Sequence, residues 1–444
     1  MTPPEPQRAV EQLGLDDLQE VWPLLDGDDR RESLLALERS EADEFFLSLS
    51  ARDQSGVLVG LPHAQARAWM RLLAPDDAAD VIQGTDREHR DELLRLLDDP
   101  TRREVQGLLA YAEDDAGGLM NPRYARLRPD MSVDEAIAYL RKQAREQAET
   151  IYYAYVLDAQ DRLLGVVSFR QLFSAGPAQT VSQVMNAEPV TVSEETDQEE
   201  VSRLFARHHI IAIPVVDGEN RMRGIVTVND IVDVVREEAT EDIQKIGGTE
   251  ALDAPYFEIG LGRMVRKRAG WLSALFLGEM LTATAMGYFE AEIARAVVLA
   301  LFVPLVISSG GNSGSQATTL IIRAMALGEV RLRDWWRVVH REFLSGLGLG
   351  TVLGTIGMVR IFAWQAMFRT YGTHAVVVAL TVGFSLVGVV LWGTVAGSML
   401  PFLLRRLGFD PASASAPFVA TLVDVTGLII YFTTASLVMR GSLL

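Results

Sequence analysis

Asp424 is the residue in this chain whose placement most directly suggests chemistry. It lies in the middle of residues 413–439, an apolar stretch long enough to cross a bilayer as a helix. A carboxylate at that depth costs about 2.5–3.5 kcal/mol on insertion scales, and the stretch contains no Lys or Arg to offset the charge. A cation in a water-filled path would offset it. The alternative is a protonated carboxyl group that is hydrogen-bonded between helices.

A polar segment interrupts a second apolar stretch. Residues 308–316, with the sequence SSGGNSGSQ, lie inside residues 294–326, which are too many for one simple span. Irregular backbone at membrane depth survives only where protein or water satisfies it, and Asn312 and Gln316 need polar partners. We therefore interpret the segment as a loosened helix that lines an aqueous path. The alternative is a small-residue surface at which helices pack. Glu279, in another apolar stretch, is either a second functional carboxylate or a residue that packs against a neighbouring helix.

Five apolar stretches are long enough to span a membrane, and the placement of Lys and Arg orients them. Basic clusters at residues 263–268, 331–341 and 405–406 all fall on the side of the N-terminus, which the positive-inside rule assigns to the cytoplasm. Residues 1–8 are polar and lack the apolar core of a signal peptide. We expect the N-terminal half in the cytoplasm and the C-terminus outside. The stretches are residues 270–289, 294–326, 343–368, 375–400 and 413–439.

The charge of the chain is distributed unevenly. The 444 residues have a net charge of −18, but the first 268 hold 30 basic and 51 acidic side chains, a net of −21, and the remainder has a net of +3. The chain therefore combines an acidic soluble half with a nearly uncharged membrane half, and it is not a single soluble enzyme domain. An acidic body repels phosphate, which argues against nucleic-acid binding. The absence of cysteine excludes disulfides and thiol catalysis.

The acidic half shows two kinds of periodicity. In residues 30–110, apolar residues recur at three- and four-residue spacing in short units separated by turns, which predicts a superhelical array of short helices. Asp76, Asp77 and Asp80 place three carboxylates on about one turn of it, on a face that is mostly solvated. Residues 126–245 instead contain pairs of strands preceded by amphipathic helices, and this unit occurs twice. The second pattern indicates an internal duplication of a β–α–β–β–α unit.

The duplicated unit resembles a tandem of CBS domains. The resemblance rests on Met185-Asn186 ahead of a short strand and on the sequences IPVVD at 213–217 and GIVTVND at 224–230. In CBS pairs a Thr and an Asp spaced like Thr227 and Asp230 commonly contact an adenosine ribose, so the resemblance implies an adenine-nucleotide site, with ATP as its ligand. The first copy has Ser168 and Gln171 at those positions, which implies at most one such site per chain. The alternative is that the pair is only a dimerising spacer.

From end to end the chain resembles the MgtE family of magnesium channels. The resemblance implies a homodimer with one pore on its two-fold axis, lined by the second and fifth spans. Asp424 would be the selectivity carboxylate, with the carbonyl of Ala420 and the side chain of Asn312 beside it. The motifs that carry the resemblance are Pro304, GGNSGSQ at 310–316, PFLLRR at 401–406, Pro417, DVTG at 424–427, DDAGGLM at 114–120 and ATEDI at 239–243.

The resemblance also implies regulatory Mg²⁺ ions between the cytosolic domains and the base of the pore. Two positions depart from the family pattern: Asn229 stands where an acidic residue is common, and Ala416 precedes Pro417 where a polar residue can occur. The departures put one metal pocket and one pore contact in doubt. The implied metal ligands, besides Asp424, are Glu44, Asp76, Asp80, Glu219, Glu250, Asp253, Glu258 and Asp410.

These observations predict a multidomain chain and a transport function without enzyme activity. We expect an all-α N-domain at 1–125, an α/β tandem CBS pair at 126–182 and 183–245, a connecting or plug helix at 246–268 and a five-helix membrane domain at 269–444. The predicted function is a Mg²⁺-gated channel that imports Mg²⁺ across the bacterial inner membrane. The alternatives are a divalent-cation secondary transporter, an intramembrane aspartyl protease that uses Asp424 from two chains, and a membrane-anchored nucleotide sensor without transport.

Overall fold

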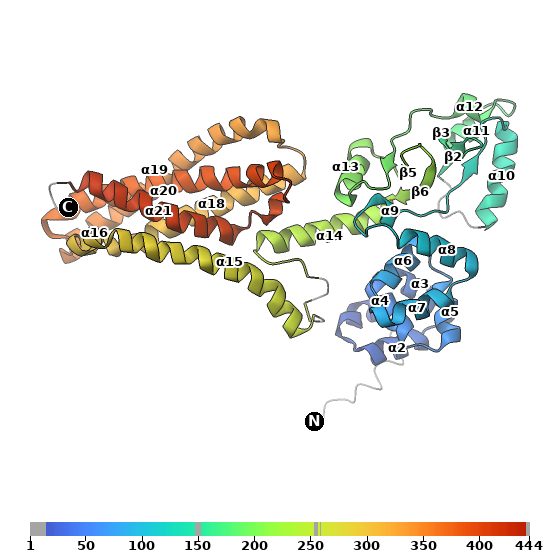
Figure 1. The fold of residues 1–444 in the computed structure, drawn as a ribbon, viewed down its shortest axis with the longest axis horizontal. Coiled ribbons are helices and arrows are strands. Elements are labelled where there is room, and N and C mark those ends of the chain that lie inside the picture. The colour runs from blue at the N-terminus through green and yellow to red at the C-terminus, as the bar shows by residue number, and fades with distance from the viewer. Residues whose placement is uncertain (1–14, 147–151, 253–255, 258, 441–444) are drawn as a thin grey trace, which may run out of the picture. The chain divides into compact units, whose positions relative to one another are not determined.

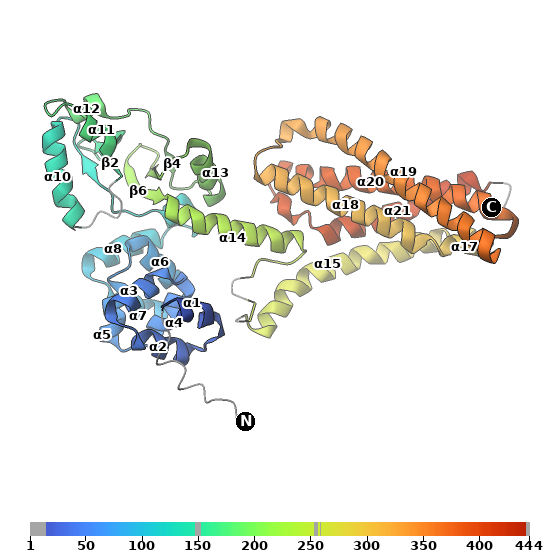
Figure 2. The same ribbon diagram turned by 180° about the vertical axis from the view of Figure 1, so that it is seen from behind.

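The computed structural model describes residues 15–146, 152–252, 256–257 and 259–440 (Figure 1; Figure 2). The chain divides into two compact units between Arg236 and Glu237, and each is considered separately. Asp253 and Glu258, two of the implied metal ligands, lie outside the described residues.

The first unit begins with the predicted array of short helices. Side chains at helix starts explain why the chain breaks into short pieces: Asp26, Ser50 and Asp98 each accept hydrogen bonds from backbone N–H groups in the following first turn. Pro75 opens one helix, where its missing N–H costs nothing. The helices are α1 (Leu15–Val21), α2 (Gly27–Ala36), α3 (Arg39–Ser48), α4 (Ala51–Val59), α5 (His63–Met70), α6 (Pro75–Gln83), α7 (Arg87–Leu96), α8 (Asp99–Leu108) and α9 (Ala116–Leu119).

Two three-stranded sheets follow, with the same order and the same register. In each sheet the first strand is parallel to the second and the second is antiparallel to the third, with Tyr153 opposite Ser168 in one copy and Ala212 opposite Thr227 in the other. The predicted duplication is therefore confirmed. The elements are β1 (Arg126–Leu127), α10 (Val133–Glu146), β2 (Tyr153–Leu157), β3 (Leu163–Ser168), α11 (Phe169–Ser174), α12 (Val181–Val184), β4 (Val192–Ser193), α13 (Gln198–His208), β5 (Ala212–Val216) and β6 (Met222–Thr227).

An asparagine pairs with the third strand of each copy. The backbone N–H and C=O of Asn121 exchange hydrogen bonds with Ile225 at 2.8 and 2.9 Å, and those of Asn186 do the same with Val166. A side chain at Gly224, next to Ile225, would overlap the backbone of Asn121. Glycine is therefore needed at position 224, where the segment that contains Asn121 lies against β6.

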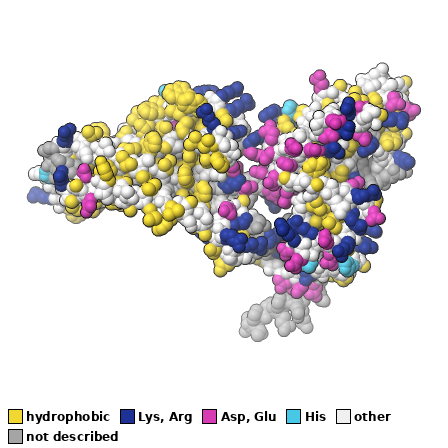
Figure 3. Space-filling model, viewed as in Figure 1, with side chains coloured by type: hydrophobic (Ala, Val, Ile, Leu, Met, Phe, Trp, Pro, Cys, Tyr) yellow, Lys and Arg dark blue, Asp and Glu magenta, His cyan; other side chains and the backbone are white. Residues whose placement is uncertain are grey.

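Among the described residues of the second unit, five helices are long and apolar enough to cross a membrane, which agrees with the predicted number of spans. Figure 3 shows hydrophobic side chains across the visible face of this unit. The first span starts earlier than expected, because the basic segment 263–268 belongs to the same helix, α15. The helices are α14 (Val228–Ile246), whose last part belongs to this unit, α15 (Leu261–Tyr288), α16 (Glu290–Arg295), α17 (Val297–Ala300), α18 (Val303–Ala326), α19 (Trp335–Phe368), α20 (Ala375–Arg406) and α21 (Ala416–Val438).

The predicted interruption at residues 308–316 is wrong, because α18 runs unbroken through it. The break falls earlier, between α17 and α18. The glycines of the segment serve instead for close packing: Cβ atoms at Gly393 and Gly397 of α20 would overlap the carbonyl oxygens of Gly310 and Gly314. Small residues let two helix backbones touch in this way. The small-residue alternative is therefore the correct one for this face of α18.

Candidate functional site

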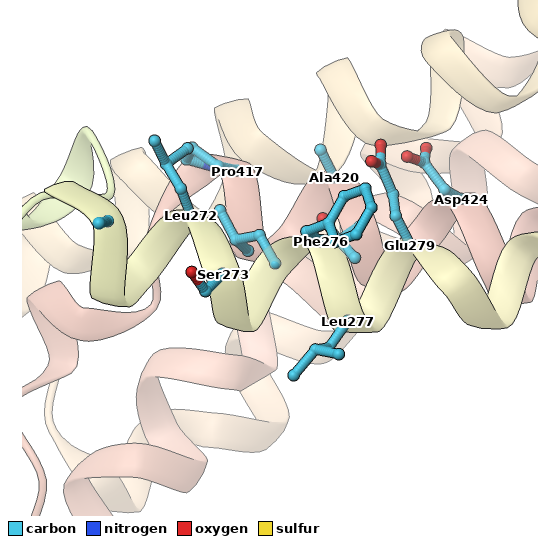
Figure 4. A pocket seen from close by; sticks show the side chains of 11 residues that line it. Leu272, Ser273, Phe276, Leu277, Glu279, Pro417, Ala420 and Asp424 are labelled. Atoms are coloured by element: carbon cyan, nitrogen blue, oxygen red, sulfur yellow. The ribbon is translucent and has the colours of Figure 1, made fainter.

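A groove of about 860 Å³ lies between α15 and α21 and contains both acidic side chains that the sequence places inside apolar spans. Glu279 enters it from α15 and Asp424 from α21, and Figure 4 shows the two carboxylates pointing toward each other. Ser273 and Thr421 add hydroxyl groups to an otherwise apolar wall. None of the described residues that line the groove is basic. The groove therefore brings two carboxylates together in an apolar part of the membrane domain, where ionised side chains are unfavourable.

The packing of α21 turns Asp424 toward this groove. Ser415 caps the helix by accepting a hydrogen bond from the backbone N–H of Phe418 at 3.3 Å. Val423, the residue before Asp424, is fully buried against neighbouring helices. The helical rotation then places Asp424 on the face that it shares with Thr421, where its side chain is partly exposed.

A glycine explains how α15 comes close enough to bring Glu279 to Asp424. A Cβ atom at Gly278 would lie 2.9 Å from Cγ2 of Thr421, so a side chain there would require Thr421 or one of the helices to shift. At the entrance to α21, Nε1 of Trp271 donates a hydrogen bond to Oγ of Ser415 at 3.1 Å. These two contacts hold α15 against α21 along the groove.

Of the three residues predicted for the pore, Ala420 and Asp424 line the groove, and Asn312 does not. Asn312 lies on an exposed face of α18 with Ser308 and Gln316, one helical turn apart from each other. Its Nδ2 is 3.5 Å from Oγ of Ser308. The neighbouring Gly311 lies against Ala420, since a Cβ atom there would be 3.4 Å from the Cα of Ala420. The polar face of α18 therefore begins beside the backbone of α21.

The implied metal ligands of the first unit occupy dissimilar surroundings. Asp76 is buried and accepts a hydrogen bond from Nδ2 of Asn121 at 3.0 Å, whereas Asp80 is half-buried one turn later on α6. Glu44 is exposed on α3. Glu219 lies in the turn after β5, and Nη2 of Arg221 donates a hydrogen bond to it at 2.6 Å. Among the described parts of the chain, no three His, Asp or Glu side chains are grouped so as to hold a metal ion.

In the second unit, Asp410 has a cationic partner from within the chain. Nζ of Lys245, in the last turn of α14, donates a hydrogen bond to Oδ2 of Asp410 at 2.7 Å and also pairs with Glu241. Glu250 is exposed, and its Oε1 would lie 3.8 Å from a Cβ atom at Gly270. Lys245 is not among the residues predicted from the sequence. The sequence shows only a Glu four residues before it on a helix, which is typical of an ordinary surface ion pair.

The second CBS copy presents the predicted Thr and Asp together. Oδ2 of Asp230 accepts hydrogen bonds from the backbone N–H and the hydroxyl of Thr227, at 2.8 and 2.9 Å. Desolvation raises the pKa of Asp230 to about 6; the two hydrogen bonds from Thr227 oppose the shift, and the carboxylates of Asp77 and Asp233 add to it. In the first copy, Gln171 accepts equivalent hydrogen bonds from Ser168 at 2.8 Å but carries no charge.

Three family models match the chain in the order of its domains. The MgtE intracellular N domain matches residues 13–114, the CBS domain matches 116–177 and 181–237, and the MgtE divalent cation transporter matches 303–434. The magnesium transporter MgtE of Thermus thermophilus is 42% identical to this chain, over 98% of this chain and 95% of its own length. The chain belongs to the MgtE family.

The chain is also similar to other MgtE proteins. The magnesium transporter MgtE of Enterococcus faecalis is 32% identical over 76% of this chain and 72% of its own length. A crystal structure of the cytosolic domain of the Mg²⁺ channel MgtE in complex with ATP is 42% identical and covers 51% of this chain and 93% of its own, with a TM-score of 0.47. This MgtE chain is thus a multi-pass membrane protein, and its membrane part matches the model of a divalent cation transporter.

Proposed function

We propose that this MgtE protein is a Mg²⁺-selective channel that imports Mg²⁺ down its electrochemical gradient as a homodimer. Its N-terminal domains would lie in the cytoplasm and its C-terminus outside the inner membrane. The observation that carries the proposal is the position of Asp424, an ionisable side chain in the middle of a membrane helix that faces an open groove. Such residues in membrane helices usually mark an ion path.

The chemistry of Mg²⁺ explains why one carboxylate per chain suits a channel. Mg²⁺ prefers six oxygen ligands at about 2.0–2.1 Å and gives up its waters reluctantly. A protein that passes the ion rapidly should therefore hold it with most of its waters in place. A pair of Asp424 carboxylates from two chains supplies a charge of −2, and Asn312 with the carbonyl of Ala420 would accept hydrogen bonds from the waters of the ion.

Purified full-length protein in liposomes tests the transport step. We expect Asp424→Asn to abolish Mg²⁺ uptake while the protein remains folded and assembled by size-exclusion chromatography. Glu290→Gln, which changes an exposed carboxylate on α16, should leave uptake unchanged. Normal uptake by Asp424→Asn would refute the proposal, and uptake that requires a counter-ion would favour a secondary transporter.

We further propose that cytosolic Mg²⁺ closes the channel. The first 268 residues carry a net charge of −21, so their carboxylates would repel one another at low Mg²⁺ and would be bridged as Mg²⁺ rises. A site that binds tenfold more tightly in the closed state contributes about 1.4 kcal/mol, and three or four such sites give about 4–6 kcal/mol. That range is sufficient to move a channel from mostly open to mostly closed.

Single-channel recording tests this regulation. Combined neutralisation of Asp76, Asp80 and Asp253 should keep the channel open at millimolar cytoplasmic Mg²⁺. An open probability that depends on Mg²⁺ as in the wild type would contradict the proposed regulation and leave the transport proposal intact.

Adenine-nucleotide binding at the second CBS copy is the remaining part of the proposal. Asp230 and Thr227 are held together at the end of β6, and a carboxylate there would accept hydrogen bonds from ribose hydroxyls. Isothermal titration of the full chain with ATP should give one site per chain, which Asp230→Ala removes. The same affinity in wild type and variant would contradict this assignment.

A further inference from the structure

We propose that Glu279 is a second ion-binding carboxylate of the membrane domain, which holds a divalent cation together with Asp424 in the groove between α15 and α21. The inference rests on the proposed function and adds to it the residue that sets the affinity of the path for its ion. It concerns α15, whereas the pore predicted from the sequence involves only the second and fifth spans.

Glu279 and Asp424 come from different helices and point toward each other across one groove. The helices are in close contact beside them, because a Cβ atom at position 278 would lie 2.9 Å from Cγ2 of Thr421 and would require Thr421 or one of the helices to shift. The close approach of the two helices thus occurs one residue from Glu279 and three from Asp424.

Two carboxylates that face each other at membrane depth repel, and each disfavours the ionised state of the other unless a cation intervenes. The described residues that line the groove include no Lys or Arg that could neutralise the pair. The groove, at about 860 Å³, has room for a cation with bound waters. Mg²⁺ in proteins is typically held by one or two carboxylates while it keeps several waters.

The lining of the groove also suits a hydrated ion. The hydroxyl-bearing residues Ser273 and Thr421 lie in the same groove as the two carboxylates. Hydroxyl groups can accept hydrogen bonds from waters that the ion retains. A groove that only accommodated lipid would need neither the two carboxylates nor the two hydroxyls.

A purely structural Glu279 makes a different prediction. In that case the side chain is protonated and neutral, and its role is to fill space and donate a hydrogen bond. Gln has nearly the same shape as protonated Glu and also donates a hydrogen bond, so Glu279→Gln would preserve a structural role. The same substitution removes the charge that would bind a cation, and it therefore separates the two roles.

The experiment measures Mg²⁺ uptake by full-length protein in liposomes as a function of external Mg²⁺. We expect Glu279→Gln to raise the half-saturating Mg²⁺ concentration about tenfold and Glu279→Asp, whose carboxylate is withdrawn by one methylene, to raise it about threefold. Glu290→Gln on α16 is the matched control and should behave as wild type. A wild-type half-saturating concentration in Glu279→Gln would overturn the proposal.

If Glu279→Gln does not yield folded protein, Glu279→Asp decides: a raised half-saturating concentration supports the proposal, and a wild-type value overturns it. Loss of folded protein in both variants would show that Glu279 is structural and also overturn it. If wild-type protein carries no Mg²⁺, the proposed function itself fails. If Asp424→Asn abolishes uptake while Glu279→Gln leaves its Mg²⁺ dependence unchanged, only this inference fails.

Discussion

Nζ of Lys245 donates a hydrogen bond to Oδ2 of Asp410 at 2.7 Å, which joins the end of α14 to the loop that leads into α21. Desolvation opposes the charge on Lys245, but its hydrogen bonds to Asp410 and Glu241 outweigh that effect and raise the pKa of Lys245. The lysine is therefore charged throughout the physiological range. The ammonium group of Lys245 therefore binds Asp410, which the family resemblance names as a ligand of Mg²⁺.

Replacement of Lys245 should make this connection depend on Mg²⁺. In Lys245→Met, Glu241 and Asp410 lose a shared cation, and breaking charged hydrogen bonds of this kind costs about 1.5–3 kcal/mol. We expect a lower unfolding temperature in detergent without Mg²⁺ and a recovery at millimolar Mg²⁺ that exceeds the stabilisation of the wild type. Lys142→Met, on the exposed face of α10, is the control. An unfolding temperature equal to that of the wild type without Mg²⁺ would show that the pair contributes little.

The charge on Asp230 should destabilise the first unit at neutral pH. Its pKa of about 6 in the folded state exceeds the usual 3.8, chiefly because of desolvation. The folded protein thus binds the proton more tightly than the unfolded chain. The stability that this provides is complete below about pH 4 and is lost as the pH rises through 6.

Asp230→Asn should therefore stabilise the fragment 1–236 at pH 7.5, by about 2 kcal/mol, and by little at pH 4. Urea unfolding between pH 4 and 8, with EDTA present, measures the difference. Glu188→Gln, an exposed carboxylate, is the control and should show no such pH dependence. If Asp230→Asn raised the free energy of unfolding equally at pH 4 and pH 7.5, ionisation of Asp230 would not be the cause.

The contact between α18 and α20 should not tolerate a single methyl group. A Cβ atom at Gly397 would overlap the carbonyl oxygen of Gly314, next to the hydrogen bond from Thr318 to the Gly397 carbonyl. We expect Gly397→Ala to destabilise the protein by about 1–3 kcal/mol, although Ala is the better helix former by about 1 kcal/mol. Gly348→Ala on α19 has no atom within 4 Å of its added Cβ and should be neutral or stabilising. Thermal unfolding in detergent compares the two, and equal effects would mean that the backbones can separate freely.

Asn121 should stabilise the first unit through Asp76. Its Nδ2 donates a hydrogen bond to the buried Asp76 at 3.0 Å, and the loss of a partner for a buried carboxylate costs about 1–3 kcal/mol. Asn121→Ala should lower the free energy of unfolding of the fragment 1–236 by that amount in EDTA. Asn229→Ala, which is exposed, should have little effect. A loss of the same size in both variants would mean that the bond to Asp76 is not its cause.

Much of the architecture could be predicted because its signals are local. Short apolar runs define the paired strands, and long, predominantly apolar stretches define the membrane helices. Asp424 could also be singled out, since an isolated carboxylate in an apolar stretch is unusual whatever surrounds it. The neighbourhood of Glu279 could not be read in the same way, because it depends on which face of α15 meets α21.

The glycine-rich segment of α18 shows where local reasoning fails. Glycine weakens an isolated helix, so the run at 310–314 suggests a break. In the folded unit the same glycines allow α20 to approach, and the packing gained there outweighs the low helix propensity. Lys245 illustrates a similar limit: its sequence neighbour Glu241 suggests a surface pair, whereas its second partner, Asp410, is distant in sequence.

The backbone contacts of Gly310 and Gly314 with α20 have a consequence for movement. Two helices that touch at successive turns without intervening side chains cannot slide past each other, so α18 and α20 should move as one body. By contrast, none of the residues of α15, all of which the structure describes, is buried in the unit. A change in the width of the groove should then come mainly from displacement of α15 relative to α21.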